Sequence, residues 1–91
     1  MAYHLELSPA AQRDIRKLDP HIRKRINSDL LRLEEAPRPA GAERLHAKEK
    51  LYRLHVGPKK NYRVIYQIKD EVLLVLVIRV GDRKEVYRRL K

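Results

Sequence analysis

The chain has 91 residues, no cysteine and a net charge of +10, so we expect residues 1–91 to fold as one domain. The absence of cysteine excludes disulfides, thiolate metal ligands and a cysteine nucleophile, and no His/Asp/Glu cluster has metal-ligand spacing, so no metal or other cofactor is expected. The longest apolar run, residues 72–78, is far shorter than the ~20 residues of a membrane span, and the first residues lack a signal-peptide pattern, so a cytoplasmic protein is expected.

The first part of the chain predicts a strand followed by a helical hairpin. Alternating apolar and polar residues predict a strand at about residues 2–7. A capping residue followed by proline, which is typical of a helix start, occurs at Ser8-Pro9 and again at Asp19-Pro20. We therefore expect one helix from residue 9 to about 18 and another from 20 to about 36. Their buried stripes are Ala11, Ile15 and Leu18 in the first helix and Ile22, Ile26, Leu30 and Leu33 in the second.

Pro37 and Pro39 end the second helix, because proline cannot continue it. We interpret residues 37–50 as an ordered loop with Leu45 as its anchor in the core.

The second part of the chain predicts three consecutive strands. Residues 51–56 and 61–68 alternate apolar and polar side chains, and residues 72–78 form an apolar run typical of a central strand. The linking segments are short, with Gly, Pro and Asn in the first and Asp70-Glu71 at a solvated tip in the second, so the strands should form an antiparallel meander. After Gly81 we expect a turn and a short final helix.

The fold class is therefore α+β: an N-terminal strand, a helical hairpin, a three-stranded antiparallel meander and a short C-terminal helix. The helices should cover one sheet face, which leaves Arg53, His55 and Arg63 on the other. Residues 51–91 contain eleven Lys/Arg and four Asp/Glu, against eleven and eight in residues 1–50. This asymmetry favours a polyanion as partner of the second part, although an acidic protein would use the same field and solubility alone would also explain it.

Three segments together resemble the RelE/ParE toxins of bacterial and archaeal toxin–antitoxin systems. They are LYRLHVG at residues 51–57, NYRVIY at 61–66 and VGDRKEVY at 80–87, and the order of elements fits along essentially the whole chain. For the RelE branch, the resemblance implies a metal-independent endoribonuclease that cleaves mRNA in the ribosomal A site and is silenced by a RelB-like antitoxin. The ParE branch shares the fold and poisons DNA gyrase, so the fold alone does not separate the two. A basic nucleic-acid-binding module without catalysis is the third alternative.

The resemblance also implies catalytic roles for Arg63, Arg83, Tyr87 and His55. Arginines can stabilise the charge that develops when a 2′-OH attacks the adjacent phosphorus, and Arg63 and Arg83 match the family's arginines. Tyr87 matches the family's C-terminal tyrosine, which could transfer a proton or stack on a base, although packing in the core is also open.

His55 and Arg53 stand where catalytic members often carry lysine. His55 could be the general base or a solvated strand histidine. A second departure is Asp82, which places an acid beside Arg83. RNA contacts are expected from five cations: Arg53, Lys59, Lys60, Lys84 and Arg88.

Overall fold

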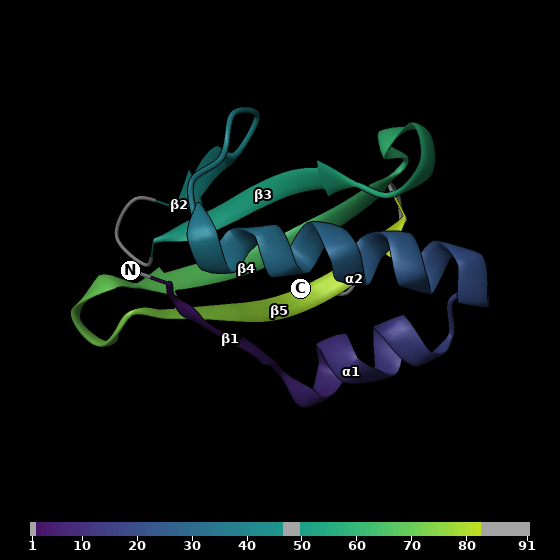
Figure 1. Cartoon of the computed structure of the whole chain (residues 1–91), viewed down its shortest axis with the longest axis horizontal. Coiled ribbons are helices and arrows are strands. Elements are labelled where there is room, and N and C mark those ends of the chain that lie inside the picture. The colour runs from purple at the N-terminus through teal and green to yellow at the C-terminus, as the bar shows by residue number, and fades with distance from the viewer. Residues whose placement is uncertain (1, 47–49, 83–91) are drawn as a thin grey trace.

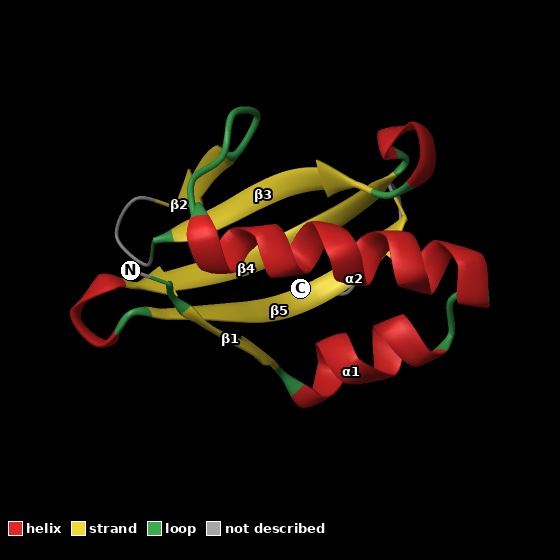
Figure 2. Ribbon diagram, in the orientation of Figure 1, coloured by secondary structure: helices red, strands yellow, loops and turns green. Residues whose placement is uncertain are grey.

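The computed structural model describes residues 2–46 and 50–82, and within them two helices cover one face of a sheet (Figure 1). The sheet has five strands in the order β1-β5-β4-β3-β2 (Figure 2). The α+β class is therefore confirmed. The elements are β1 (His4–Leu7), α1 (Pro9–Arg16), α2 (Pro20–Glu35), β2 (Glu43–His46), β3 (Leu51–Val56), β4 (Tyr62–Lys69) and β5 (Leu74–Asp82), with 3₁₀ turns η1 (Pro58–Lys60) and η2 (Asp70–Val72).

Both helices begin at the predicted capping residues. The Ser8 hydroxyl accepts a hydrogen bond from the Ala11 N–H at 3.0 Å, and the Asp19 carboxylate accepts one from the His21 N–H at 3.0 Å. The Ser8 hydroxyl also donates to the Ile78 carbonyl at 2.7 Å. One side chain thus caps α1 and fixes its start against β5.

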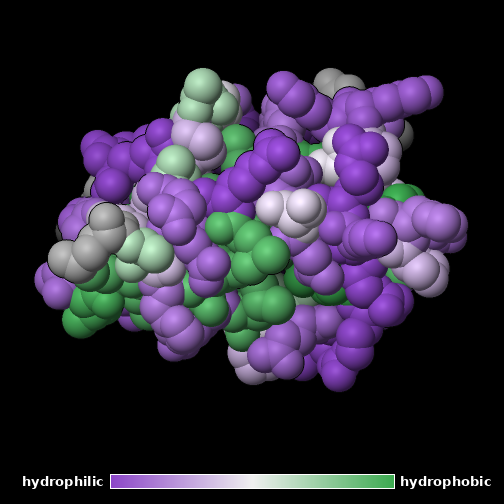
Figure 3. All heavy atoms as spheres, in the orientation of Figure 1, coloured by the Kyte–Doolittle hydropathy of each residue, from purple (hydrophilic) through white to green (hydrophobic). Residues whose placement is uncertain are grey.

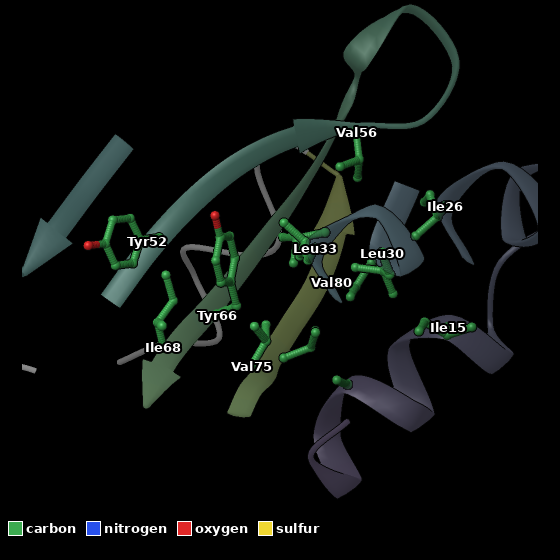
Figure 4. Close-up of a cluster of buried hydrophobic side chains, with 13 residues drawn as sticks. Ile15, Ile26, Leu30, Leu33, Tyr52, Val56, Tyr66, Ile68, Val75 and Val80 are labelled. Atoms are coloured by element: carbon green, nitrogen blue, oxygen red, sulfur yellow. The ribbon is translucent and has the colours of Figure 1, made fainter. Parts of the chain in front are cut away.

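The core lies between the helices and the sheet (Figure 4). Apolar side chains from α2 meet apolar side chains of the central strands, and nearly all are removed from water. Burying a side chain of this size contributes about 1.5–3 kcal/mol, so this layer is the main source of stability. The α2 residues are Ile26, Leu30 and Leu33, and the strand residues include Val64, Tyr66, Ile68, Val75, Val77 and Val80.

Strands β3, β4 and β5 form the predicted antiparallel meander. β1 lies outside it and pairs in parallel with β5. Parallel neighbours need a long connection, and here the chain passes through the helical hairpin and the other strands before β5. In the register, Arg63 of β4 lies between His55 of β3 and Gly81 of β5.

The limits of the last strand differ from the prediction. Val72 lies in η2 and is 62% exposed, so the strand begins at Leu74 rather than at residue 72. It continues through Gly81 to Asp82, so the turn expected after Gly81 is wrong by at least one residue. Backbone pairing with β4 extends the strand past the apolar run, because the ladder does not require apolar side chains. The expected final helix lies outside the described residues.

The interpretation of residues 37–50 as a loop is also wrong in part. Glu43–His46 forms the edge strand β2, paired antiparallel with β3. Leu45 is 36% exposed and does not anchor the segment in the core. A strand of four mostly polar residues has too little alternation to be recognised from sequence.

Polar contacts centred on Asp70, rather than an apolar anchor, hold residues 37–46 and 50 against the sheet. The Asp70 carboxylate accepts hydrogen bonds from the Tyr3 hydroxyl at 2.7 Å, from Arg38 at 2.7 and 3.2 Å, and from the Lys50 ammonium at 3.3 Å. The Arg38 Nε–H also donates to the Tyr52 hydroxyl at 3.0 Å. The hydrogen bonds from Arg38 and then Tyr3 hold the pKa of Asp70 well below its usual range. The expected turn is present and Glu71 is exposed, but Asp70, whose side chain is 34% exposed, is also bound to three partners.

Asp70→Asn is expected to remove part of the acid sensitivity of folding. Because the pKa of Asp70 is lowered in the folded state, its contribution is complete above the unfolded pKa of about 3.9 and is lost as the pH falls through the folded value. In urea unfolding, the native chain should have a larger free energy of unfolding than the variant near neutral pH. This difference should shrink below about pH 4. Glu71→Gln, in the same turn, is the control, and an equal advantage of the native chain over Asp70→Asn at about pH 2 and pH 6 would contradict the assignment.

Candidate functional site

The candidate site lies on the sheet face opposite the helices. Arg53 and His55 of β3 and Arg63 of β4 alternate along their strands with residues that pack under α2, so their side chains project from the other face. The register places His55 directly opposite Arg63. Strand pairing thus brings together the cationic residues that the sequence predicted for these two strands.

A hydrogen bond joins His55 and Arg63, the arginine–histidine row of the site. The Arg63 Nε–H donates to His55 Nε2 at 3.0 Å. Because a guanidinium group can only donate, Nε2 of His55 is the acceptor in this contact. Arginine has five N–H donors in one plane, so a single bond at Nε orients the whole guanidinium group. His55 is half-buried and bonded to Arg63, which is more structured than the solvated strand histidine that the sequence left open.

Arg53 lies two register positions from the His55–Arg63 pair and has a carboxylate partner. It forms an ion pair with Glu43 of β2, the residue opposite it in the sheet. Glu43 lies on β2, the strand that was not predicted from the sequence. An RNA phosphate at Arg53 would therefore have to compete with Glu43.

Lys59 and Lys60 lie on η1, at the connection between β3 and β4. Both have positive φ, 55° and 54°, a region that non-glycine residues seldom occupy. Gly57 precedes them with φ 79°, and a Cβ there would come within 3.0 Å of the Tyr62 ring. The Gly57 N–H donates to the Asp29 carboxylate of α2 at 2.9 Å, which fixes the turn against the helix.

The remaining predicted site residues, Arg83, Lys84, Tyr87 and Arg88, lie outside the described residues. The described chain ends at Asp82, directly after Gly81, the residue paired with Arg63. The roles of these four residues stay predictions.

A buried ion pair between α1 and β5 was not predicted. Asp14 of α1 is 5% exposed, and its carboxylate accepts from Arg79 Nε and Nη2, each at 2.9 Å, and from the Val80 N–H at 3.0 Å. β1 pairs with β5 only as far as Val77, so beyond that residue β1 no longer supplies hydrogen-bond partners to β5. There the Asp14 carboxylate accepts the hydrogen bond of the Val80 N–H instead. The signal in the sequence was an aspartate inside the stripe Ala11, Ile15 and Leu18, because an acid on a buried face requires a partner.

In the part of the chain that the structure describes, no group of three or more His, Cys, Asp or Glu side chains could hold a metal ion. Neither of the described helices combines the length and the apolar character that a membrane crossing demands.

The fold and the site define a class: a small basic α+β domain with a helical hairpin on one sheet face and an arginine–histidine row on the other. The family model of the ParE toxin of the parDE type II toxin–antitoxin system matches residues 5–87. The chain therefore belongs to the RelE/ParE family of toxins, and the resemblance seen in the sequence is confirmed.

Several known proteins are similar over nearly their full length. The chain is 35% identical over 89 residues to the mRNA interferase toxin RelE of Escherichia coli, covering 96% of this chain and 92% of the relative. It is 31% identical over 93 residues to toxin RelG of Mycobacterium tuberculosis, covering 98% and 100%.

Solved structures agree with this relationship. A mutant of E. coli toxin RelE in the free state superposes with a TM-score of 0.79 at 32% identity, covering 97% of this chain and 93% of that chain. The match to the intact E. coli RelBE toxin–antitoxin complex has a TM-score of 0.75 at 30% identity, covering 91% and 99%.

Proposed function

We propose that this chain is the toxin of a toxin–antitoxin pair and an mRNA interferase, a metal-independent endoribonuclease that cuts mRNA in the ribosomal A site. The observation that supports it most is the hydrogen-bonded Arg63–His55 row on the sheet face opposite α1 and α2. The named E. coli relative is an mRNA interferase. The gyrase-poison alternative rests on the description of the family model alone.

In the proposed reaction, the 2′-OH of one nucleotide attacks the adjacent phosphorus. The O2′–P bond forms, the P–O5′ bond breaks, and the products carry a 2′,3′-cyclic phosphate and a 5′-hydroxyl. Arg63 and Arg83 stabilise the phosphorane, since guanidinium binds two phosphate oxygens at once. Tyr87 donates a proton to the leaving oxygen or stacks on a base.

The contact between Arg63 and His55 suggests how the base is released. With no substrate, His55 Nε2 accepts from Arg63 and its lone pair is occupied. A phosphate that binds the guanidinium would compete for Arg63 and free Nε2 to take the proton of the 2′-OH. His55 therefore acts as the base only with substrate present, while Arg53 helps to position the phosphate.

We further propose a RelB-like antitoxin as the protein partner. Solved relatives include toxins in complex with RelB-type antitoxins. A net charge of +10 favours an acidic, partly disordered segment that folds as it covers the Arg63 face. The other partners are the ribosome and its mRNA, so we expect the activity in the cytoplasm.

The decisive experiment is synthesis of the protein in a translating extract, followed by primer extension on a reporter message. Breaks within translated codons, absent when initiation is blocked, are the expected result. End-group analysis should find 2′,3′-cyclic phosphate, the product of 2′-OH attack. An intact message with gyrase-linked DNA breaks would move the protein to the ParE branch, and RNA binding without any breaks would support the non-catalytic module.

A further inference from the structure

A cavity of about 500 Å³ lies beside the candidate site, between α2, residues 39–40 and the end of β3 with η1. Figure 3 shows apolar surface lying between hydrophilic side chains at the upper edge of the molecule, the side on which β3 and η1 lie in Figure 1. The volume falls within the range of small-molecule sites, which is roughly 300–1,000 Å³. A cavity of this size accommodates one nucleotide.

The walls of the cavity are cationic and its floor is apolar. Arg25 and Arg32 project from α2, seven residues apart and so on one helix face, and Lys59 and Lys60 face them from η1. Asp29 lies between the two arginines and is engaged by the Gly57 N–H. Leu54 and Val56 of β3 contribute to the floor. The lining therefore fits an anion that also has an apolar face.

The cavity adjoins the end of β3, the strand that carries His55. β2 pairs with β3 only over residues 51–53, so from Leu54 onward the edge of β3 borders the cavity. Residue 55 is among those that line the cavity, and the His55 side chain accepts a hydrogen bond from Arg63 at Nε2. A strand of RNA that crosses this edge could contact Arg63 with one phosphate and enter the cavity with the next nucleotide.

We propose that this cavity is a subsite for a nucleotide flanking the scissile phosphate of single-stranded RNA. The proposal rests on the function proposed above. The base lies against Leu54 and Val56, and the phosphate is held by Lys59 and Lys60 with the two α2 arginines. No aromatic ring is among the residues described as lining the cavity, so base preference is weak and salt dependence is strong. An acidic peptide is less favoured, because a cavity the size of one nucleotide, adjoining His55, matches a polymer already held at Arg63.

The test is fluorescence anisotropy of the full chain with a labelled 2′-O-methyl RNA hexamer, which cannot be cleaved because its 2′-oxygen is blocked. The double variant Lys59→Asn/Lys60→Asn removes two charges with a residue that tolerates positive φ. We expect about tenfold weaker binding and a salt slope reduced by about 0.7 for each phosphate that the variant no longer neutralises. Ala40→Glu, an acid on the exposed wall, should weaken binding as well.

The matched control is Arg13→Gln/Lys17→Gln, which removes two exposed cations from the α1 region and should leave the affinity within about twofold of the native chain. Equal losses in both double variants would overturn the subsite, because they would indicate a general charge effect. Loss of binding to an alternating glutamate–leucine decapeptide, with RNA affinity kept, would also overturn it and assign the cavity to protein docking.

These experiments distinguish failure of the proposed subsite from failure of the proposed ribonuclease function. Binding is measured without catalysis, so a native chain that cuts no message but shows the predicted loss of RNA affinity overturns only the ribonuclease. A native chain that cuts message in the extract, with RNA affinity unchanged in Lys59→Asn/Lys60→Asn, overturns only the subsite.

Discussion

Arg63→Ala is expected to slow mRNA cleavage by about 10²–10³-fold, the usual effect of removing one preorganised donor from a developing charge. Arg63 is the strand arginine of the candidate site, and its guanidinium is oriented by its bond to His55. Single-turnover cleavage on programmed ribosomes, with the toxin in excess, measures the loss at the chemical step. Arg63→Lys should recover only part of the rate, since an ammonium keeps the charge but lacks the planar fork.

The stability of Arg63→Ala should change by no more than about 1 kcal/mol, because a partly exposed arginine contributes little to folding. Thermal unfolding of the variant therefore separates lost chemistry from lost structure. Lys24→Ala, an exposed cation of α2, is the control and should retain full activity. Cleavage by folded Arg63→Ala at the native rate would remove Arg63 from the reaction.

Asp14→Asn is expected to destabilise the fold by about 3–5 kcal/mol, the cost of leaving a buried charge without its counterpart. Asp14 is 5% exposed, and its carboxylate binds Arg79 through two nitrogens and the Val80 N–H. The amide keeps the shape but loses the charge, and its NH₂ group cannot accept from Arg79. Urea unfolding monitored by circular dichroism measures the difference.

Comparing a single with a double variant shows how much of the loss in stability comes from the unpaired charge of Arg79. Asp14→Leu/Arg79→Met should be more stable than Asp14→Leu alone, because no unpaired buried charge remains, although the Val80 N–H still lacks its acceptor. Glu43→Gln, which breaks the more exposed pair with Arg53, is the control and should cost less than about 1 kcal/mol. If Asp14→Asn costs no more than Glu43→Gln, the buried pair does not stabilise the fold.

Local signals in the sequence were sufficient for the helices, for the meander and for the shared sheet face of His55 and Arg63. Each helix start requires only a capping side chain and a proline, which are neighbours in the chain. The alternation of residues 51–56 and 61–68 determines which side chains face the helices, and short links between strands favour antiparallel pairing. Together these features are enough to place His55 and Arg63 on the same sheet face, away from the helices.

Only the tertiary structure decided the contacts between distant segments. Arg79 reaches Asp14 across 65 positions of sequence, and Tyr3 reaches Asp70 across 67. No local period encodes such a pair: the position of Asp14 in the apolar stripe of α1 indicates that it needs a partner, but not which residue that partner is. The same reason explains β2 and the cavity beside His55: a short polar strand forms only because β3 offers a free edge, and the cavity exists only where that pairing stops.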